Sequence, residues 1–466
     1  MSEIPLRGIV MNKKIKGIAV IMALILLIGG SAAFGTVDNT DYPYSFSANV
    51  SFNANKEFQT IQGFGGFGFR DVNWSDPSNW WTDSWGDTVL NDLGLSLTRN
   101  EWYPPQIEGE IQDANWEIQK PFIQKYHNLA RLSGKPLKQI LAIWSPPAYM
   151  KSNNSTKNGG TLLPEYYDDF GKWLVECLDA YKEAGVNVYG ISPQNEPSAV
   201  VPYNSCHYTP EEYVNMIKVV GPIVKKAYPN VKLMGPEEMT CETWIWNKSY
   251  GKALLEDKEA LKWIDIIIVH AYTIEYQDVP SDTRLEAMQM KQVYEKYKMA
   301  GKEIWQTEVC SFLNHFQYKV IIAESIFNSL YYGNASAWLS WVVSADGSVP
   351  GNYLMKHEEK GPLYYGLRQF SKYVLPGAKR VYSSSSNDEL LAIAFKHPEN
   401  KTFTMVLINK AFVPMNVKLD GNINTKMNMV MTTDTENAVS AGTMNSSGSK
   451  TTLPPRSIIT LQGTYK

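Results

Sequence analysis

The chain has 466 residues, of which 44% are hydrophobic and 20% charged, a composition that supports large buried cores in more than one domain. The formal net charge of −3 gives no electrostatic reason to expect nucleic acid or an anionic membrane as a partner. With 14 Trp and 27 Tyr, the chain is rich in flat amphipathic rings, which suit sugar faces as well as core packing.

The N-terminus has the features of a secretory signal peptide. Three lysines between residues 13 and 16 precede an apolar run over residues 17–30, and small residues follow up to Ala33. The alternative, a membrane anchor, would need a longer apolar run. We therefore expect residues 1–33 to be removed, with Met11 as the true start, and the mature protein to be secreted without a membrane anchor.

The region 58–377 alternates short apolar runs with helical stretches. Strands are expected at residues 60–66, 95–102, 138–147, 188–197, 231–239, 264–273, 302–310 and 335–344. The helices expected between them include 165–184, 210–228, 283–300 and 318–332, the second with Thr209 as its N-cap and Pro210 at its first position. Eight such βα units predict a closed (β/α)8 TIM barrel, with an open doubly wound α/β sheet as the alternative.

The two chain ends have a different pattern. Residues 378–466 form short strand-like runs split by Asn, Gly, Ser and Pro, which predicts a small β-sandwich appended to the barrel. Residues 34–57 include an alternating, strand-like stretch from residue 41. We expect this stretch to complete the sandwich, so that both chain ends build the second domain.

Polar and aromatic side chains stand at the ends of the predicted barrel strands. They are Arg99, Trp144, Glu196, Glu237, His270, Tyr272, Glu308 and Trp341. In a closed barrel the carboxyl ends of all strands converge on one face, where active sites lie. This placement favours the barrel over the open sheet.

Two of these residues form a candidate catalytic pair. Glu196 in "QNEP" and Glu308 in "WQTEV" end the fourth and seventh predicted strands. Glycoside cleavage uses two carboxyl groups, one protonated to assist the leaving oxygen and one ionised to attack the anomeric carbon. For either Glu alone, a solvated or salt-bridged strand end is the simpler interpretation. Glu237 is a third strand-end carboxylate and a reserve candidate, for which a structural role is the more common one. The matched placement of Glu196 and Glu308 favours catalysis.

Neighbouring residues fit the same chemistry. Asn195 can bond a sugar hydroxyl beside the scissile bond, and Arg99 can keep a nucleophilic carboxylate ionised, with a plain salt bridge as its alternative role. Trp144, Tyr272 and Trp341 are candidate stacking walls for a sugar chain, with core packing as the alternative.

The sequence predicts no cofactor and no metal. The six His lack metalloprotease spacing, and His270 is expected to donate or accept hydrogen bonds at the site. The "GFGGFG" stretch at 63–68 formally matches a dinucleotide motif, but no helix start follows it. The four Cys lack metal-ligand spacing, and Cys206 and Cys241 are candidates for a disulfide because export permits one.

At these motifs the chain resembles glycoside hydrolase family 30, a family of retaining (β/α)8 enzymes. The matching stretches are "IQGFGGFG", "TRNEW", "WSPPAYMK", "ISPQNEP", "HAY" and "IWQTEV", and the resemblance spans about residues 47–465. It implies that Glu196 is the acid/base and Glu308 the nucleophile. It also implies that Asn195, Arg99, Trp144 and Tyr272 contact the substrate.

The family cleaves xylans, β-1,6-linked glucans and galactans, glucosylceramide and fucosides. "YGISPQNEP" and "GLRQFSKYVLPGAKRV" are similar to the xylanase-type members. Members specific for glucuronoxylan carry arginines just after the eighth strand, where this chain has Ser344 and Ala345. The additional stretches 74–86 and 151–161 are expected to shape a different cleft.

We therefore expect a monomeric, secreted, retaining hydrolase of a β-linked polysaccharide, with xylan first and without dependence on glucuronate. One alternative is the same fold acting on β-1,6-galactan or glucan, or as an exo-glycosidase. A second is a non-catalytic carbohydrate-binding protein that keeps the aromatic cleft. The intact pair of Glu196 and Glu308 argues against the second.

Overall fold

The computed structural model describes residues 44–68, 82–105, 115–135, 137–240, 249–273, 282–310, 318–345 and 353–466. The expected signal segment lies outside these residues. In the part of the chain that is described, no helix combines the length and the apolar character needed to cross a membrane.

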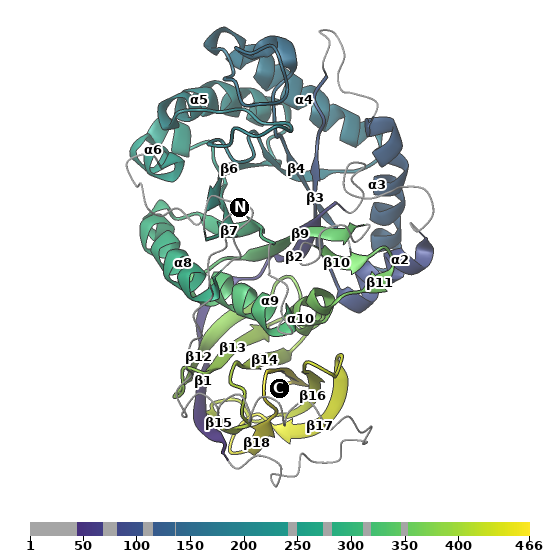
Figure 1. Cartoon of the computed structure of the whole chain (residues 1–466), viewed down its shortest axis with the longest axis vertical. Coiled ribbons are helices and arrows are strands. Elements are labelled where there is room, and N and C mark those ends of the chain that lie inside the picture. Colours follow the sequence, from purple (N-terminus) through teal and green to yellow (C-terminus); the bar gives the residue numbers. More distant parts are fainter. Residues whose placement is uncertain are drawn as a thin grey trace, which may run out of the picture. The chain divides into compact units, whose positions relative to one another are not determined.

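The central element is a closed parallel barrel (Figure 1). Its strands are β2 (Gly63–Phe67), β3 (Leu97–Glu101), β4 (Lys138–Ala142), β5 (Val188–Ser192), β6 (Lys232–Thr240), β7 (Ile266–Tyr272), β8 (Glu303–Glu308) and β9 (Ala337–Ala345). The pairing of β8 with β9 closes the ring, with Trp305 opposite Ala337 and Gln306 opposite Trp338. The predicted (β/α)8 barrel is therefore confirmed, and the open sheet is excluded.

Several barrel strands are shorter than their sequence pattern predicts. β4 ends at Ala142 and β5 at Ser192, several residues before the expected ends. The chain stays tethered just beyond them, since the Ile143 N–H donates to the Ser192 carbonyl and the Asn195 N–H to the Ile143 carbonyl. The polar residues of "QNEP" thus lie immediately after the strand, on a backbone that the neighbouring strand still holds.

Helices surround the barrel in Figure 1. They are α2 (Asp83–Asp87), the π-helical η2 (Thr88–Leu93), α3 (Asn115–Leu132), α4 (Tyr167–Glu183), α5 (Pro210–Ala227), α6 (Tyr250–Glu256), α7 (Lys258–Leu261), α8 (Thr283–Tyr297), α9 (Tyr318–Phe327), the π-helical η7 (Asn328–Tyr332) and α10 (Pro362–Ser371). Three 3₁₀ turns, η3 (Ala148–Met150), η4 (Pro164–Tyr166) and η6 (Lys298–Ala300), and the short strands β10 (Tyr353–Lys356) and β11 (Glu359–Lys360) complete this part. The capping box at Thr209 and Glu212 confirms the predicted start of α5.

The second sheet contains both ends of the described chain. Its order is β17-β16-β19-β14-β13-β12-β1-β15-β18, and β1 (Phe46–Thr60) pairs antiparallel with β12 and parallel with β15. The other strands are β12 (Lys379–Ser385), β13 (Leu390–His397), β14 (Thr402–Asn409), β15 (Met415–Gly421), β16 (Lys426–Thr432), β17 (Val439–Asn445), β18 (Lys450–Leu453) and β19 (Ser457–Thr464). This confirms the predicted β-sandwich built from both chain ends.

Alternation along β1 explains its place in the sandwich. Ala48, Val50, Phe52 and Ala54 point into the sandwich core, while the residues between them are exposed. A period of two with small and branched apolar residues on one face is what a half-buried strand requires.

Helix α10 links the barrel to the sandwich. Its Gln369 side chain donates to Thr432 Oγ1 of β16 at 2.7 Å and accepts from Thr460 Oγ1 of β19 at 2.5 Å. Gly366 of the same helix packs so closely on α9 that a Cβ there would overlap the Lys319 carbonyl oxygen and a methyl group of Ile322. The absence of a side chain at residue 366 therefore sets the distance between α9 and α10.

Gly366→Ala tests this close approach. Alanine normally favours a helix interior over glycine by about 1 kcal/mol. Here the added methyl meets backbone, so we expect the free energy of unfolding to fall by about 1–3 kcal/mol, as in overpacked cores. Urea unfolding of both proteins measures the change, and an unchanged or higher midpoint would contradict the packing argument.

Candidate active site

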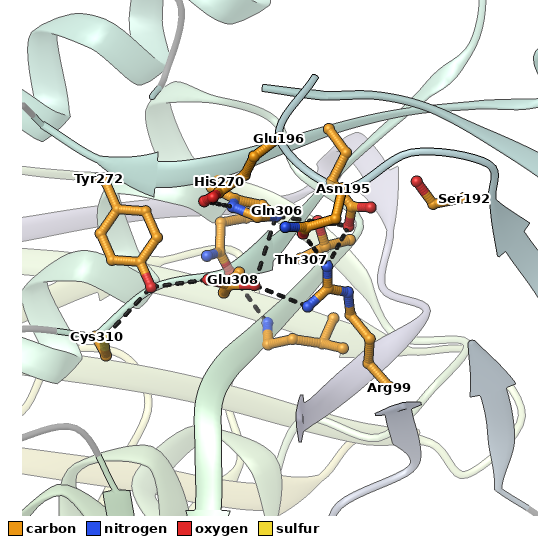
Figure 2. A network of polar contacts seen from close by, with 12 residues as sticks. Arg99, Ser192, Asn195, Glu196, His270, Tyr272, Gln306, Thr307, Glu308 and Cys310 are labelled. Carbon is orange, nitrogen blue, oxygen red and sulfur yellow. Dashed lines mark hydrogen bonds and ion pairs between the residues drawn. The ribbon is translucent and has the colours of Figure 1, made fainter. Parts of the chain in front are cut away.

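Arg99, in β3, is fully buried and ties three residues together (Figure 2). Its Nη1 donates to Glu308 Oε2 at 2.8 Å, and its Nη2 donates to Asn195 Oδ1 at 2.6 Å and lies 3.0 Å from Glu237 Oε1. Burial alone would lower the pKa of Arg99, but the carboxylates of Glu237 and Glu308 raise it instead. The guanidinium is thus a permanent cation beside Glu308.

Asn195 and Glu196 follow β5 on a turn that the barrel fixes. The Glu196 N–H donates to the Glu237 carbonyl at 3.0 Å, and Glu196 has a left-handed φ of 45°. A non-glycine residue there is held by its surroundings. Because Arg99 occupies Asn195 Oδ1, the amide group of Asn195 is oriented with its NH₂ left for a ligand.

Glu237 lies in β6, between the cations of the site. It is fully buried, Thr307 Oγ1 donates to its Oε1 at 3.0 Å, and His270 Nε2 lies 3.5 Å from the same oxygen. Burial would raise the pKa of Glu237, but Arg99 and His270 outweigh it and lower the pKa to about 2. Glu237 is therefore an ionised counter-charge, which agrees with its expected structural role.

His270, in β7, connects all three carboxyl groups. Its Nδ1 lies 3.0 Å from Glu196 Oε1, and its Nε2 lies 3.7 Å from Glu308 Oε2. Burial would lower the pKa of His270, yet the carboxylates of Glu308, Glu196 and Glu237 raise it to about 9. At neutral pH the imidazole is therefore a cation that donates to Glu196.

The cluster brings three carboxyl groups together with two cations. Glu196, Glu237 and Glu308 would carry three negative charges against the two positive charges of Arg99 and His270. Burial and the Glu196 carboxylate raise the pKa of Glu308, against the opposing effects of His270, Arg99 and Tyr272. Glu237 is therefore held as an anion, while Glu308 is a carboxyl group of the cluster whose pKa is raised.

The expected aromatic residues take different positions. Trp341 of β9 stacks on Phe67 with centroids 4.3 Å apart, and Trp144 packs against the same Phe67 at 5.3 Å. The Trp144 ring is buried, with the Arg99 guanidinium 4.7 Å from its centroid. Tyr272 instead donates its hydroxyl to Glu308 Oε1 at 2.9 Å. Tyr272 therefore contacts the candidate nucleophile directly, and only Trp341 of the two tryptophans is partly exposed.

The described loops after β4 and β5 are joined to each other. The buried Lys151 amine donates to Ser145 Oγ at 2.9 Å and to the Ser205 carbonyl at 2.5 Å. Burial lowers the pKa of Lys151 to about 8. The predicted insertion 151–161 thus braces the loop that starts at Glu196. Cys206 in this loop is a buried free thiol, and its proposed partner Cys241 lies outside the described residues.

Three groups of the site could each offer one ligand atom to a metal ion. Among the described residues, one ligand atom each from Glu196, His270 and Glu308 lie within 4.8 Å of one another. Each of the three is already paired within the cluster, because His270 Nδ1 lies 3.0 Å from Glu196 Oε1 and Arg99 Nη1 donates to Glu308 Oε2. These pairings suit proton transfer and nucleophilic attack.

Sequence comparison adds the family. The glycosyl hydrolase family 30 TIM-barrel domain matches residues 106–374, and the family's β-sandwich domain matches residues 377–461. The chain belongs to glycosyl hydrolase family 30.

Relatives within family 30 have more than one named activity. The chain is 27% identical to a putative glucosylceramidase 2 of Caenorhabditis elegans, over 78% of this chain and 77% of that protein. It is 23% identical to the glucuronoxylanase XynC of Bacillus subtilis strain 168, over 79% and 80% of the two chains. The fold matches the family 30 subfamily 8 xylanase Xyn30A of Clostridium acetobutylicum with a TM-score of 0.73, at 23% identity, covering 89% of this chain and 99% of that one.

Family 30 enzymes are retaining glycoside hydrolases, and the geometry agrees. Retaining enzymes hold their two carboxyl groups about 5–5.5 Å apart, whereas inverting enzymes leave about 6.5–9.5 Å for a water molecule. In this family 30 chain, one carboxyl oxygen of Glu196 and one of Glu308 lie within 4.8 Å of each other. This close approach agrees with the shorter, retaining separation.

Sequence reasoning found most of this family 30 site but missed two of its members. Thr307 and Cys310 flank Glu308 in "QTEVC", and they contact Glu237 and Tyr272 respectively. Alternation along β8 placed Thr307 on the opposite side from Glu308, so no sequence signal linked it to the site. The structure brings it into the site because its hydroxyl donates to Glu237 Oε1, a carboxylate of β6.

The raised pKa of His270 predicts a specific pH dependence of stability. The folded-state pKa of about 9 exceeds the ordinary value of 6.5. The stabilisation that protonated His270 contributes, at most about 3 kcal/mol, is therefore complete below pH 6.5 and is lost as pH rises through 9. We expect the free energy of unfolding to be higher for the wild type than for His270→Gln. We expect this difference to be larger at pH 6 than at pH 9.5.

Urea unfolding of both proteins at the two pH values measures this difference. Other groups that titrate in the same range, such as Lys151 and Glu286, are present in both proteins. Their contributions therefore cancel in the difference between the two free energies of unfolding. An equal difference at pH 6 and pH 9.5 would show that His270 is not held as a cation in the folded state.

Proposed function

We propose that the protein hydrolyses a β-linked polysaccharide with retention, with Glu196 as acid/base and Glu308 as nucleophile. The observation that carries the proposal is the shared network in which Arg99 binds Glu308 and Asn195 while His270 binds Glu196. This network gives the two carboxyl groups different partners, and different partners allow one to hold a proton while the other stays ionised.

The reaction follows from these partners. Glu308, with its two oxygens held by Arg99 and Tyr272, attacks the anomeric carbon and forms a covalent glycosyl-enzyme. Glu196 gives its proton to the leaving glycosidic oxygen and then, as a base, takes one from the water that releases the sugar. His270 stabilises the Glu196 carboxylate that exists between the two steps.

Xylan is the first substrate of the proposal. Support comes from the likeness to XynC and to the xylanase Xyn30A. Dependence on a glucuronate side group is not part of the proposal. Ser344 is buried and accepts a hydrogen bond from Trp85 Nε1 at 2.9 Å, and Ala345 has no polar side chain. Neither Ser344 nor Ala345 is a cation that could bind a carboxylate there.

A second candidate is a β-glucosidic bond. The observation that favours it is the 27% identity to a protein named a putative glucosylceramidase. β-1,6-Linked glucan or galactan and exo-acting cleavage belong to the same alternative, because the catalytic pair is the same in each. We further propose secretion, on the basis of the charged and apolar N-terminal sequence.

Replacing the two carboxyl groups should give different results with different leaving groups. Glu196→Gln should slow polysaccharide cleavage by about 10²–10⁴-fold, the usual contribution of a positioned acid. It should slow the first step for a dinitrophenyl glycoside much less, because that leaving group needs no proton. Glu308→Gln should abolish both activities, since no nucleophile remains. Single-turnover release of the leaving group measures the first step.

Glu286→Gln is a matched control for these variants. Glu286 is a buried carboxyl on α8 that bonds Ser325 and Asn328, and burial raises its pKa to about 8. It is protonated at neutral pH, so glutamine replaces it closely and should leave activity unchanged. Wild-type activity in Glu196→Gln or Glu308→Gln would refute the assignment.

A panel of glycans should distinguish the substrates. We expect oligosaccharide products from xylan whether or not its glucuronate groups have been removed, with rates within about threefold, because Ser344 and Ala345 at the end of β9 carry no charge to bind the side group. Product sizes from xylan, β-1,6-glucan, β-1,6-galactan and aryl glucosides give both the linkage and the mode of attack. Cleavage of decorated xylan alone would contradict the proposed independence from glucuronate.

A further inference from the structure

The hydroxyl of Tyr272 lies between two groups of the β8 end. It is 2.9 Å from Glu308 Oε1 and 3.3 Å from Cys310 Sγ (Figure 2). Cys310 is a buried free cysteine two residues after Glu308, and it plays no part in the reaction steps above. A thiol in contact with a group that binds the nucleophile calls for an explanation.

The chemistry of the three groups fixes the direction of the hydrogen bonds. Burial raises the pKa of Tyr272 well above its ordinary value, so the phenol is neutral and has one proton to donate. A carboxylate is a far better acceptor than a thiol, so this proton goes to Glu308. The remaining interaction is then a donation from the Cys310 S–H to the lone pairs of the Tyr272 oxygen.

This chain matters when the charge on Glu308 changes. As Glu308 attacks, its carboxylate becomes an ester and the hydrogen bond from Tyr272 weakens. A phenolic O–H is free to rotate about its C–O bond, so it could then turn away and would have to return before the next step. A thiol that donates to the phenolic oxygen keeps the O–H directed toward Glu308 through this exchange.

We propose that Cys310 is a positioning residue that acts through Tyr272 on Glu308. The inference deepens the proposed function and rests on Glu308 being the nucleophile. It assigns to the Cys310 side chain the task of donating a hydrogen bond. Serine can perform that task in part, and alanine cannot.

A double-mutant cycle tests the inference. Cys310→Ala should lower kcat about fivefold, the usual effect of losing one net hydrogen bond, with a much smaller change in KM. Cys310→Ser should retain activity within about twofold. In a Tyr272→Phe background, Cys310→Ala should have no further effect, because the oxygen that receives the thiol proton is gone. Cys177→Ala, which removes a buried thiol of α4, is the control for thiol loss and should leave kcat unchanged.

The same cycle in stability separates this inference from the proposed function. Urea unfolding of the four proteins needs no substrate, and it should show coupling between residues 272 and 310 even if no tested glycan is cleaved. Equal effects of Cys310→Ala in the wild type and in Tyr272→Phe, in both kcat and unfolding, would overturn the inference. An unaltered kcat in Cys310→Ala would do the same, while leaving the roles of Glu196 and Glu308 untouched.

Discussion

The buried guanidinium of Arg99 is the group on which the rest of the site depends. Moving a cation out of water into the barrel interior costs several kcal/mol unless its partners compensate. Arg99 lies in β3, and its guanidinium contacts the carboxylates of Glu237 and Glu308. Because the guanidinium is a planar fork, it holds both carboxylates and the Asn195 amide in fixed directions. These contacts offset the free-energy cost of burying Arg99, and they also fix the orientation of the candidate nucleophile.

Glu237 is the carboxylate that lies beside both cations of the cluster. Arg99 also binds Glu308, and His270 also lies against Glu196. The third carboxylate contacts both cations, and the low pKa of Glu237 keeps it ionised. Glu237 thereby offsets part of the positive charge that the two cations bring to the candidate catalytic pair, Glu196 and Glu308.

The sequence predicted the elements of this site better than their contacts. The alternation of apolar runs with helical stretches located the eight barrel strands. The polar residues at the strand ends, Glu196, Glu308, Arg99 and His270 among them, were then expected on one face, because the carboxyl ends of all strands of a closed barrel lie there. It did not predict that the Trp144 ring would cover Arg99, nor that Tyr272 would bind Glu308. Such contacts depend on side-chain directions and on where each strand stops, and β4 and β5 ended several residues earlier than their apolar patterns did.

The loop that starts at Glu196 is held in place by contacts with neighbouring parts of the barrel. Glu196 has a left-handed backbone conformation, which costs free energy unless neighbours hold it. One support is the Glu237 carbonyl, which accepts the Glu196 N–H, and another is the Lys151 amine, which fixes the far end of the loop at Ser205. Because the Lys151 amine also binds Ser145 after β4, the two loops form one braced unit. Glu196 is thus supported from both sides of β5, by β6 and by the loop after β4.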